Sequence, residues 1–472
     1  MMTAEQYRNS LRDGRATYLD GRRIADVTEE PYLSKAIDWI CESYRRYYST
    51  APGAFHPMYN VPRSTEDLKK RLKVLEGSDI TTGVSAVVLA LLQVAPELGK
   101  SKPVYKERIS KFLEHVRAND LRVCEAITDA KGDRSLAPSQ QDDPDLYTRV
   151  VERNSDGIFI SGAKMHITGA ALVHEIVALP TKQMKKGEDA YAVAFAIPVN
   201  APGVKVINTG YAPRVDDDRS FPLSRRENMP EGFIIFDRVF VPNERVFLDG
   251  EVEHSAKLAH ALGLWERTGG VEAVARQADL MVGMAQLIAE ANGLDKVSHI
   301  RDKINEMIIY ATMIRAGLEA ALTHTGVNAD GMVEPDELYT NAAKYYAAHN
   351  FHVMVRDLQD VAGGSVVTAP SIADLESEGV GGYVRKYMRG RTGITAEHRM
   401  KLFHLIRDTT ADAYGGWQLV TQMMAGGGMY AQRMVARRHY DMETAKEMAR
   451  KSAGIDAVEP NVELSANGRG AK

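Results

Sequence analysis

The chain has little cysteine and no long apolar run, and these two absences narrow what it can be. Only two cysteines occur among its 472 residues, Cys41 and Cys124, which excludes a disulfide framework and a cysteine-rich metal site. The longest apolar run, Val84–Leu92, is too short to cross a bilayer as a helix. The charged first residues, MMTAEQYRNSLRDGR, lack the apolar core of a signal peptide. We therefore expect a reduced, soluble, cytoplasmic protein that is not embedded in a membrane.

A large excess of charge of one sign is also missing. Lys and Arg number 59 against 63 Asp and Glu, for a formal net charge of −4, and the basic residues are scattered. This balance argues against nucleic acid or an anionic membrane surface as the main partner. No G-x-G-x-x-G motif follows a strand, because Gly363-Gly364 and Gly426–Gly428 come after helical patterns. We therefore expect no separate domain for a nicotinamide dinucleotide.

The spacing of apolar residues changes twice along the chain. In the first part they recur every three or four residues, as in Ile109–Val116, which predicts helices before an extended segment at Leu121–Ile127. Helical spacing returns near residue 255, and Leu338–Leu358 and His398–Ala413 are examples. One expected bundle stripe consists of Ile300, Ile304, Met307, Ile308, Ala311, Ile314 and Leu318.

The middle of the chain predicts strands. Tyr147–Glu152 and Ile158–Ser161 flank the turn residues Asn154–Gly157, as a β-hairpin requires. We expect further strands at Glu175–Leu179, Tyr191–Ile197, Gly203–Ile207, Gly232–Phe236, Asp237–Val241 and Val246–Leu248, with a long polar loop at Arg214–Glu231. Because 472 residues exceed one ordinary core, we predict an N-terminal mainly helical domain (1–140), a central β-domain (141–265), a C-terminal helical bundle (266–457) and a flexible tail (458–472).

Two polar, glycine-containing segments flank the start of the β-rich region: Thr128–Pro138 (TDAKGDRSLAP) and Gly162–Gly169 (GAKMHITG). Other distinctive segments are Gly21–Val27 (GRRIADV), Pro222–Arg226 (PLSRR), Phe236–Leu248 (FDRVFVPNERVFL) and Tyr383–Gly393 (YVRKYMRGRTG). With these segments in order, the chain resembles nearly end to end the flavoprotein family of the 4-hydroxyphenylacetate 3-monooxygenase large component and 4-hydroxybutyryl-CoA dehydratase. The resemblance implies an α+β multidomain, acyl-CoA-dehydrogenase-like fold with a central β-barrel or sandwich between helical domains.

The resemblance also implies that FAD lies between the β-domain and the bundle, lined by three segments. These are Lys131, Gly132, Asp133 and Arg134; then Ile167, Thr168 and Gly169; then Met424, Ala425, Gly426 and Gly427. Arg134 would bind phosphate, Thr168 would donate a hydrogen bond near flavin N5, and the glycines would allow close backbone approach. From the residues alone, the first segment is equally an exposed turn and Ala425–Gly428 a helix-terminating glycine cluster.

The chain departs from both reactions of the family. By position, the three cysteines that hold the dehydratase's iron–sulfur cluster fall near Ser78, Thr82 and Val271, which cannot act as thiolate ligands. We therefore predict no iron–sulfur cluster and no other metal site. The arginine, tyrosine and histidine that handle the phenol fall near Val84, Val88 and Glu125.

Glu125 and Thr168 are thus the candidate catalytic residues. Glu125 is either a general base or counter-charge beside the flavin, or an edge-strand carboxylate that faces water or pairs with Arg122. Trp417 and Tyr414 either form a wall of the substrate pocket or pack inside the bundle. We favour structural roles for His166, His174 and Glu175 and surface positions for Glu251 and Glu253.

Three functions remain open. The resemblance implies first a two-component, FADH2-dependent monooxygenase that hydroxylates an aromatic or small organic substrate through a flavin C4a-hydroperoxide. Its partners would be O2, the small-molecule substrate and a separate flavin reductase, with assembly as a homotetramer or dimer. The second is a redox-neutral FAD-dependent lyase, dehydratase or isomerase without the cluster. The third is a non-catalytic, flavin-binding homologue.

Overall fold

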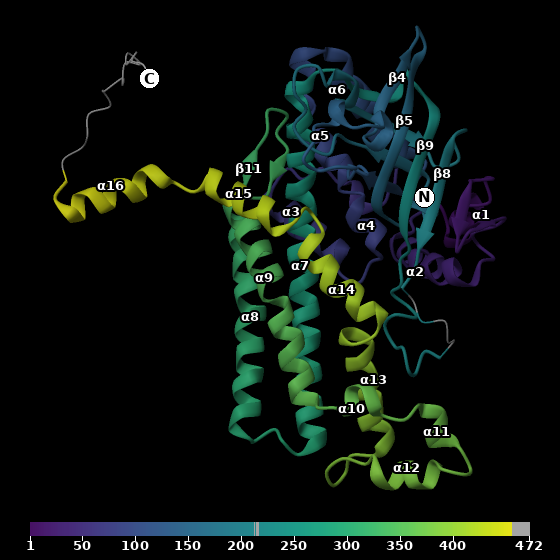
Figure 1. Ribbon diagram of the computed structural model, residues 1–472, viewed down its shortest axis with the longest axis vertical. Coiled ribbons are helices and arrows are strands. Elements are labelled where there is room, and N and C mark those ends of the chain that lie inside the picture. The colour runs from purple at the N-terminus through teal and green to yellow at the C-terminus, as the bar shows by residue number, and fades with distance from the viewer. Residues whose placement is uncertain (212, 214–216, 456–472) are drawn as a thin grey trace, which may run out of the picture.

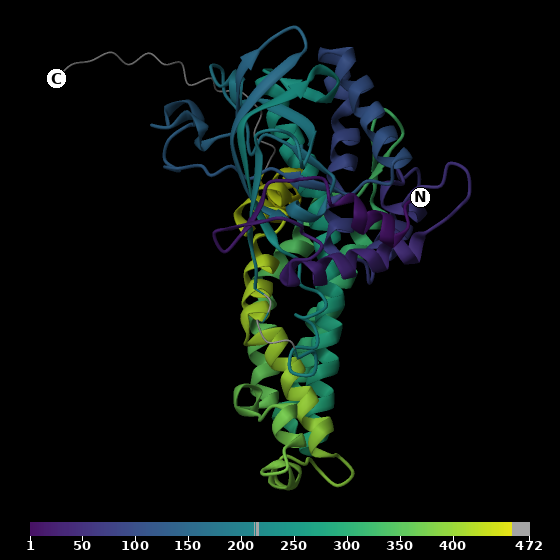
Figure 2. The ribbon, with the colours of Figure 1, turned by 90° about the vertical axis from the view of Figure 1, so that its right-hand side faces the viewer.

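The computed structural model describes residues 1–211, 213 and 217–455. Two sheets and the N-terminal helices form one end of the molecule, and a long helical bundle extends away from them (Figures 1 and 2). The first helices are α1 (Ala4–Ser10), α2 (Pro31–Tyr47), α3 (Thr65–Leu75), α4 (Ile80–Val84), α5 (Val87–Ser101) and α6 (Pro103–Ala118). The predicted tail and part of the predicted loop at Arg214–Glu231 lie outside the described residues.

The strands β1–β10 form two open sheets. The six-stranded sheet has the order β2-β1-β8-β9-β5-β4, and the four-stranded sheet has the order β10-β7-β6-β3. Their bounds are β1 (Thr17–Leu19), β2 (Arg22–Ile24), β3 (Val123–Ala126), β4 (Arg149–Arg153), β5 (Gly157–Thr168), β6 (Glu175–Ala178), β7 (Val193–Pro198), β8 (Val204–Thr209), β9 (Glu231–Pro242) and β10 (Val246–Asp249). The mixed helix-and-sheet class is confirmed. Of the predicted barrel or sandwich, a closed barrel is not found in the part of the chain that the structure describes, because each of these two sheets ends in unpaired edge strands.

The predicted hairpin is present as β4 and β5, joined by the turn at Asn154. The two strands predicted at Gly232–Phe236 and Asp237–Val241 are instead one strand, β9. This strand is continuous because β5 pairs with it from Gly157 to Thr168. From the first 140 residues, β1 joins β8 in parallel and β3 joins β6 in parallel. The early part of the chain is therefore part of both sheets.

The bundle is built around α7 (Val252–Asn292), α8 (Ser298–Thr323) and α9 (Glu337–Ala362), with the short pair β11 (Gly326–Val327) and β12 (Val333–Glu334) between the last two. Later helices are α10 (Ser365–Thr368), α11 (Ile372–Glu376), α12 (Gly381–Tyr387), α13 (Ala396–Thr410), α14 (Ala413–Met424), α15 (Met429–His439) and α16 (Met442–Ala453). In Figure 1, α15 and α16 extend outward from the body of the molecule.

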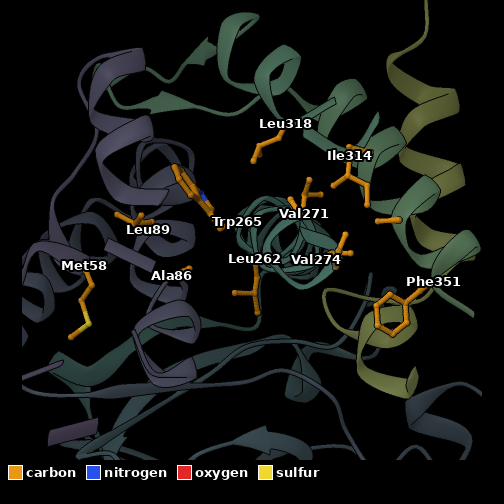
Figure 3. Packing of buried hydrophobic residues seen from close by; sticks show 14 of the residues in the cluster. Met58, Ala86, Leu89, Leu262, Trp265, Val271, Val274, Ile314, Leu318 and Phe351 are labelled. Carbon is orange, nitrogen blue, oxygen red and sulfur yellow. The ribbon is translucent and has the colours of Figure 1, made fainter. Parts of the chain in front are cut away.

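The main core surrounds α7. Figure 3 looks along this helix and shows Trp265, Val271 and Val274 projecting from it in different directions, with Leu318 and Phe351 in the surrounding helices. Six members of the predicted α8 stripe are buried. The prediction that Ile308 belongs to the buried stripe is wrong, since 45% of this residue is exposed. It follows the buried Met307 directly, and neighbouring residues in a helix point about 100° apart.

One segment, Ile80–Ser101, is long and apolar enough to cross a membrane by length and composition. It includes α4 and α5, and 67% of its most apolar window is buried inside the protein. Val87, Leu91 and Leu98 belong to the main core. The burial of this segment identifies it as a core element, and its neighbours position the cleft described next.

Candidate functional site

A cleft of about 620 Å³ lies between α2, α3 and α4 on one side and α7 and α14 on the other. Residues 218–227 of the long loop close part of it. The chain contains three tryptophans, and all of them, Trp39, Trp265 and Trp417, line this cleft. Tyr414 lines it as well, so the prediction that Trp417 and Tyr414 form a pocket wall fits their placement.

Glu125 lies next to a second carboxyl group, that of Glu266 on α7. Burial raises the pKa of Glu125 well above its usual range, and the neighbouring Glu266 and then Glu231 raise it further. Burial also raises the pKa of Glu266, while Glu125, Arg71 and Lys344 oppose that rise. Oε2 of Glu125 is sealed in the interior without a hydrogen-bond partner, so no donor there offsets the cost of a second negative charge. Burial and the neighbouring carboxyl group therefore both favour the protonated form of Glu125.

This environment bears on the second alternative for Glu125, an edge-strand carboxylate that faces water or pairs with Arg122. It lies on β3, an edge strand as expected, but its carboxyl group faces Glu266 rather than water. Arg122, the alternative partner, is fully buried elsewhere: its Nη2 lies 3.6 Å from Asp79 Oδ2, and its Nη1 donates to Thr82 Oγ1 at 2.7 Å. An Arg122–Glu125 pair is therefore wrong.

Thr168 and the bundle meet at a third carboxyl group. Thr168 ends β5 and pairs in register with Glu231 at the start of β9. The Thr168 hydroxyl donates to Glu231 Oε2 at 2.9 Å, and Trp417 Nε1 donates to Oε1 at 3.3 Å. Burial raises the pKa of Glu231, and these two hydrogen bonds oppose the rise. Glu231 thus joins the second predicted flavin segment to α14.

The first predicted segment forms a cationic loop. Lys131 is half-buried and Arg134 is exposed. Burial lowers the pKa of Lys131, and the nearby Arg134 and Lys182 lower it further, against the opposing Asp129. Burial and then Lys131 and Arg134 lower the pKa of His166 as well. The first and second segments are therefore adjacent, and the mutual repulsion of these groups indicates a site that an anion would stabilise.

Asp133 behaves as an ordinary turn residue, since its Oδ1 accepts hydrogen bonds from Ser135 N and Ser135 Oγ at 2.9 and 2.7 Å. The glycines of the first two segments serve the chain's own packing. Gly132 and Gly169 have φ of +48° and +69°. A Cβ on Gly132 would lie 2.5 Å from Leu146, and one on Gly169 would lie 2.7 Å from Thr81. The space beside both is already filled, so close approach of a ligand is not needed to explain them.

The third segment lies against the residues that surround Glu266. Arg267 Nε donates to the carbonyl of Gly426 at 2.8 Å. Gly426 and Gly427 have φ of +74° and +87°, so they turn the chain after α14. Ala425 lines the cleft, whereas the Met424 side chain is exposed. Ile167 of the second segment packs in the core between the sheets.

The other candidates have structural roles. His174 Nδ1 accepts from the Arg122 backbone N at 2.9 Å, and its Nε2 lies 2.8 Å from Ser10 Oγ. Burial lowers the pKa of His174 to about 3, so it stays neutral. Glu175 pairs with Arg245 and His115, and the Tyr105 hydroxyl donates to Glu251.

The structure also places the residues that the resemblance set at the cluster and phenol positions. Ser78 and Val84 line the cleft. Thr82 Oγ1 is engaged with Arg122 and Asp79, and Val271 packs in the bundle core. The two cysteines, Cys41 and Cys124, are buried and free. The cleft therefore receives no thiol from the described residues.

One group of potential metal ligands does come together elsewhere: His260, Glu337 and His439. His260 Nε2 lies 2.8 Å from Glu337 Oε1, so the two already satisfy each other. None of the three lines the cleft. The expectation of no metal site stays a prediction.

Three residues of the site escaped the sequence analysis: Glu266, Glu231 and Arg71. Glu266 on α7 meets Glu125 on β3 only through the tertiary fold, and Glu231 meets Thr168 only through strand register. Arg71 occupies a helix that reads as an ordinary amphipathic one. No local spacing signals these contacts, which join residues far apart in the chain.

Comparisons with known proteins found matches over nearly the whole chain. Models described as the N-terminal and C-terminal parts of 4-hydroxyphenylacetate 3-hydroxylase match residues 3–248 and 255–454. The chain is 30% identical to 4-hydroxybutyryl-CoA dehydratase/vinylacetyl-CoA-Delta-isomerase from Clostridium aminobutyricum, over 96% of this chain and 100% of that protein. It is 28% identical to the 4-hydroxyphenylacetate 3-monooxygenase oxygenase component from Thermus thermophilus, over 91% and 92%.

Solved structures agree with these matches. The oxygenase component of 4-hydroxyphenylacetate 3-monooxygenase, complexed with FAD and 4-hydroxyphenylacetate, superimposes with a TM-score of 0.88 at 26% identity. That alignment covers 96% of this chain and 98% of the other. The resemblance inferred from the sequence, with its two branches, is confirmed.

Proposed function

This chain belongs to the 4-hydroxyphenylacetate 3-hydroxylase family, and we propose on that premise that it is the oxygenase component of a two-component, FADH2-dependent monooxygenase. The overall reaction converts a substrate C–H bond, O2 and FADH2 into C–OH, water and FAD. Solved relatives are complexed with FAD. A separate reductase would supply FADH2, since no nicotinamide-binding motif is present in the sequence.

The residues of the seam between the sheets and the bundle fit FAD. Lys131 and Arg134, with Lys182 nearby, provide positive charge for the diphosphate. Thr168 and Trp417 converge on Glu231 and would border the isoalloxazine ring. Bound there as FADH2, the cofactor supplies the two electrons that reduce O2.

The chain's own residues manage protons and water in this reaction. The raised pKa of Glu125 favours its protonated form, in which it would act as an acid and supply a proton to the oxygen atom that leaves as water. Glu266 accepts the hydrogen bond from Glu125 and holds that carboxyl group in place. Trp265, Trp417 and Tyr414 provide the apolar walls that exclude bulk water from the cleft.

The observation that carries this proposal is the set of side chains at the cluster-ligand positions. Ser78, Thr82 and Val271 cannot bind an iron–sulfur cluster, and the whole chain has only two cysteines. Without the cluster, the dehydratase branch lacks its Lewis acid. Oxygenation needs only FADH2, O2, a dry pocket and a placed proton donor.

The proposal is tested with the full chain, chemically reduced FAD and isotopically labelled O2. A panel of phenols and small organic acids is incubated, and products are analysed by mass spectrometry. We expect one labelled oxygen atom per product molecule. Rapid oxidation of FADH2 to FAD with formation of peroxide, and no labelled product from any compound, would contradict oxygenation.

The second candidate is a redox-neutral, FAD-dependent lyase or isomerase without a cluster. The 30% identity to the dehydratase/isomerase over the whole of both chains favours it, and a proton-sharing carboxyl pair suits proton removal at carbon. If the chain converts an acyl thioester under anaerobic conditions without net oxidation or reduction of the flavin, the result favours this candidate over oxygenation.

We further propose that the active form is a homotetramer or dimer, as the exposed bundle helices and the projecting α15 and α16 suggest. Light scattering of the purified chain tests this. A monomer at micromolar concentration would contradict it.

A further inference from the structure

One cation in the cleft has no role in the chemistry described so far. Arg71 lies on α3 and lines the cleft, and only 6% of it is exposed. Its Nη1 donates to the Met58 carbonyl at 2.5 Å. Among the described residues it forms no other hydrogen bond and no ion pair. Arg71 is thus a buried guanidinium with most of its donors unused.

The other buried arginines of the described chain are better satisfied. Arg15 pairs with Asp13 and also donates to two carbonyl groups. Arg122 lies near Asp79 and donates to Thr82, and Arg267 donates to Gly426 and Asn341. Arg71 therefore differs from its counterparts in forming a single hydrogen bond and no ion pair, not in being buried.

The free donors of Arg71 open onto the cleft. Its Nε and Nη2 form no hydrogen bond. Neither atom is among the sealed interior atoms that lack a partner, so both remain accessible. Nε and Nη2 form one edge of the planar guanidinium, which is the edge that binds both oxygens of a carboxylate. A phenolate has a single oxygen and uses this fork less completely.

The electrostatics leave Arg71 in need of an anion. Burial lowers its pKa to about 10, so it remains charged at neutral pH, and Glu266 only partly opposes this effect. The Glu266 carboxyl group is engaged with Glu125 and lies beyond ion-pair distance of Arg71. A buried, unpaired cation is costly, and the cost is recovered when a matching anion binds.

The surroundings of Arg71 define the rest of the ligand. Leu68, Leu72 and Leu75 from the same helix, together with Trp265 and Leu322, form an apolar lining. Glu266 lines the same cleft, and Glu125 lies beside it. A matching molecule has an apolar body and one carboxylate.

We propose that Arg71 binds the carboxylate of the substrate, so that the substrate is an apolar organic acid whose carboxylate lies against α3. This inference deepens the proposed function and rests on it for the identity of the cleft as the reaction site. Arg71 acts as a binding residue for substrate and not as a donor of protons.

The test measures binding of matched ligands to the full chain by calorimetry, with and without FAD. The probes are phenylacetate, which has only the carboxylate, 4-hydroxyphenylacetamide, which has only the phenol, and phenylacetamide, which has neither. The variants are Arg71→Met, Arg71→Lys and the control Arg276→Met. Arg276 also lines the cleft but is half-exposed and paired with Glu272 at 2.7 Å.

We expect wild type to bind phenylacetate roughly 10-fold to 100-fold more tightly than phenylacetamide, as charge-assisted hydrogen bonds allow. Arg71→Met abolishes this preference, Arg71→Lys reduces it, and Arg276→Met leaves it unchanged. Equal or absent binding of phenylacetate to wild type would overturn the proposal, as would a preference that survives Arg71→Met. Selective loss of 4-hydroxyphenylacetamide binding in Arg71→Met would assign the cation to a phenolate and also overturn it.

Thermal unfolding of the ligand-free variants separates binding from a structural role. If Arg71 serves a ligand, Arg71→Met melts at the same temperature as wild type or higher, since an unpaired buried charge is removed. A lower melting temperature that Arg71→Lys restores would show that the cation stabilises the fold, against the proposal. The binding experiment measures no turnover. A failed preference for the acid would therefore contradict only the role of Arg71, whereas a failure to incorporate labelled oxygen would contradict the proposed function.

Discussion

The Glu125→Gln variant tests the proton-sharing carboxyl pair in detail. Glutamine has the size of a protonated glutamic acid, and its amide donates a hydrogen bond to Glu266 at every pH. The variant therefore keeps the contact seen in the structure but cannot lose or deliver a proton. Stability and catalysis respond to this change in different, calculable ways.

The sign of the stability effect follows from the raised pKa of Glu125. Above the unfolded pKa of about 4.3, the folded wild type binds one proton more than the unfolded chain. Its stability therefore falls as pH rises from there through the folded pKa, by at most about 1.4 kcal/mol per pH unit from this group. Glu125→Gln removes that slope, so its stability advantage over wild type grows with pH and is smallest near pH 4.

The assay is urea unfolding at half-unit steps from pH 4 to pH 8, where the chain unfolds reversibly. The control is Glu152→Gln, an exposed carboxyl on β4 that is paired with Arg238. Parallel stability curves for wild type and Glu125→Gln would refute the assignment of the proton to Glu125. In turnover, loss of a placed acid lowers kcat by roughly 100-fold to 10,000-fold, and an unchanged kcat would remove Glu125 from the chemistry.

Four further predictions concern other parts of the site. Arg134→Ala should weaken FAD binding at least several-fold in calorimetry, and unchanged affinity would mean that the phosphate site is elsewhere. Thr168→Val removes the hydroxyl that donates to Glu231 and should alter the rate of FADH2 oxidation more than FAD affinity. Asp408→Ala deletes the acceptor of two loop amides, those of Leu223 and Ser224 at 2.9 Å, and should cost about 1–3 kcal/mol while speeding hydrogen exchange in residues 217–230. Burial lowers the pKa of Lys344 to about 8, so wild type should gain stability between pH 8 and about 10.4, a rise that Lys344→Met lacks.

Much of the fold followed from periodicity. Alternation and turn residues predicted the β4–β5 hairpin, because a two-stranded unit is specified by residues close in sequence. The α8 stripe was nearly complete, and Ile308 failed because apolar composition does not reveal which side of a helix faces its neighbours. The closed barrel was wrong because closure depends on pairing between the edge strands, which no single strand encodes.

The candidate site was likewise predicted only in part from the sequence. Glu125 was found from its position relative to a known family, but its environment was not, since Glu266 approaches it from a helix some 140 residues later in the chain. The surroundings of the glycines were not foreseen either: a Cβ on Gly132 or Gly169 would meet Leu146 or Thr81. Contacts between distant segments, which sequence spacing does not contain, determine the charge of each group in the cleft.

The most direct test of the account is titration of the purified chain with FAD, oxidised and reduced, under anaerobic conditions. Because Trp39, Trp265 and Trp417 all line the cleft, flavin bound at the seam should quench tryptophan emission. We predict saturable quenching with one FAD per chain, in at least the reduced state. A chain that shows no saturable quenching and no bound flavin in either redox state would contradict the central claim.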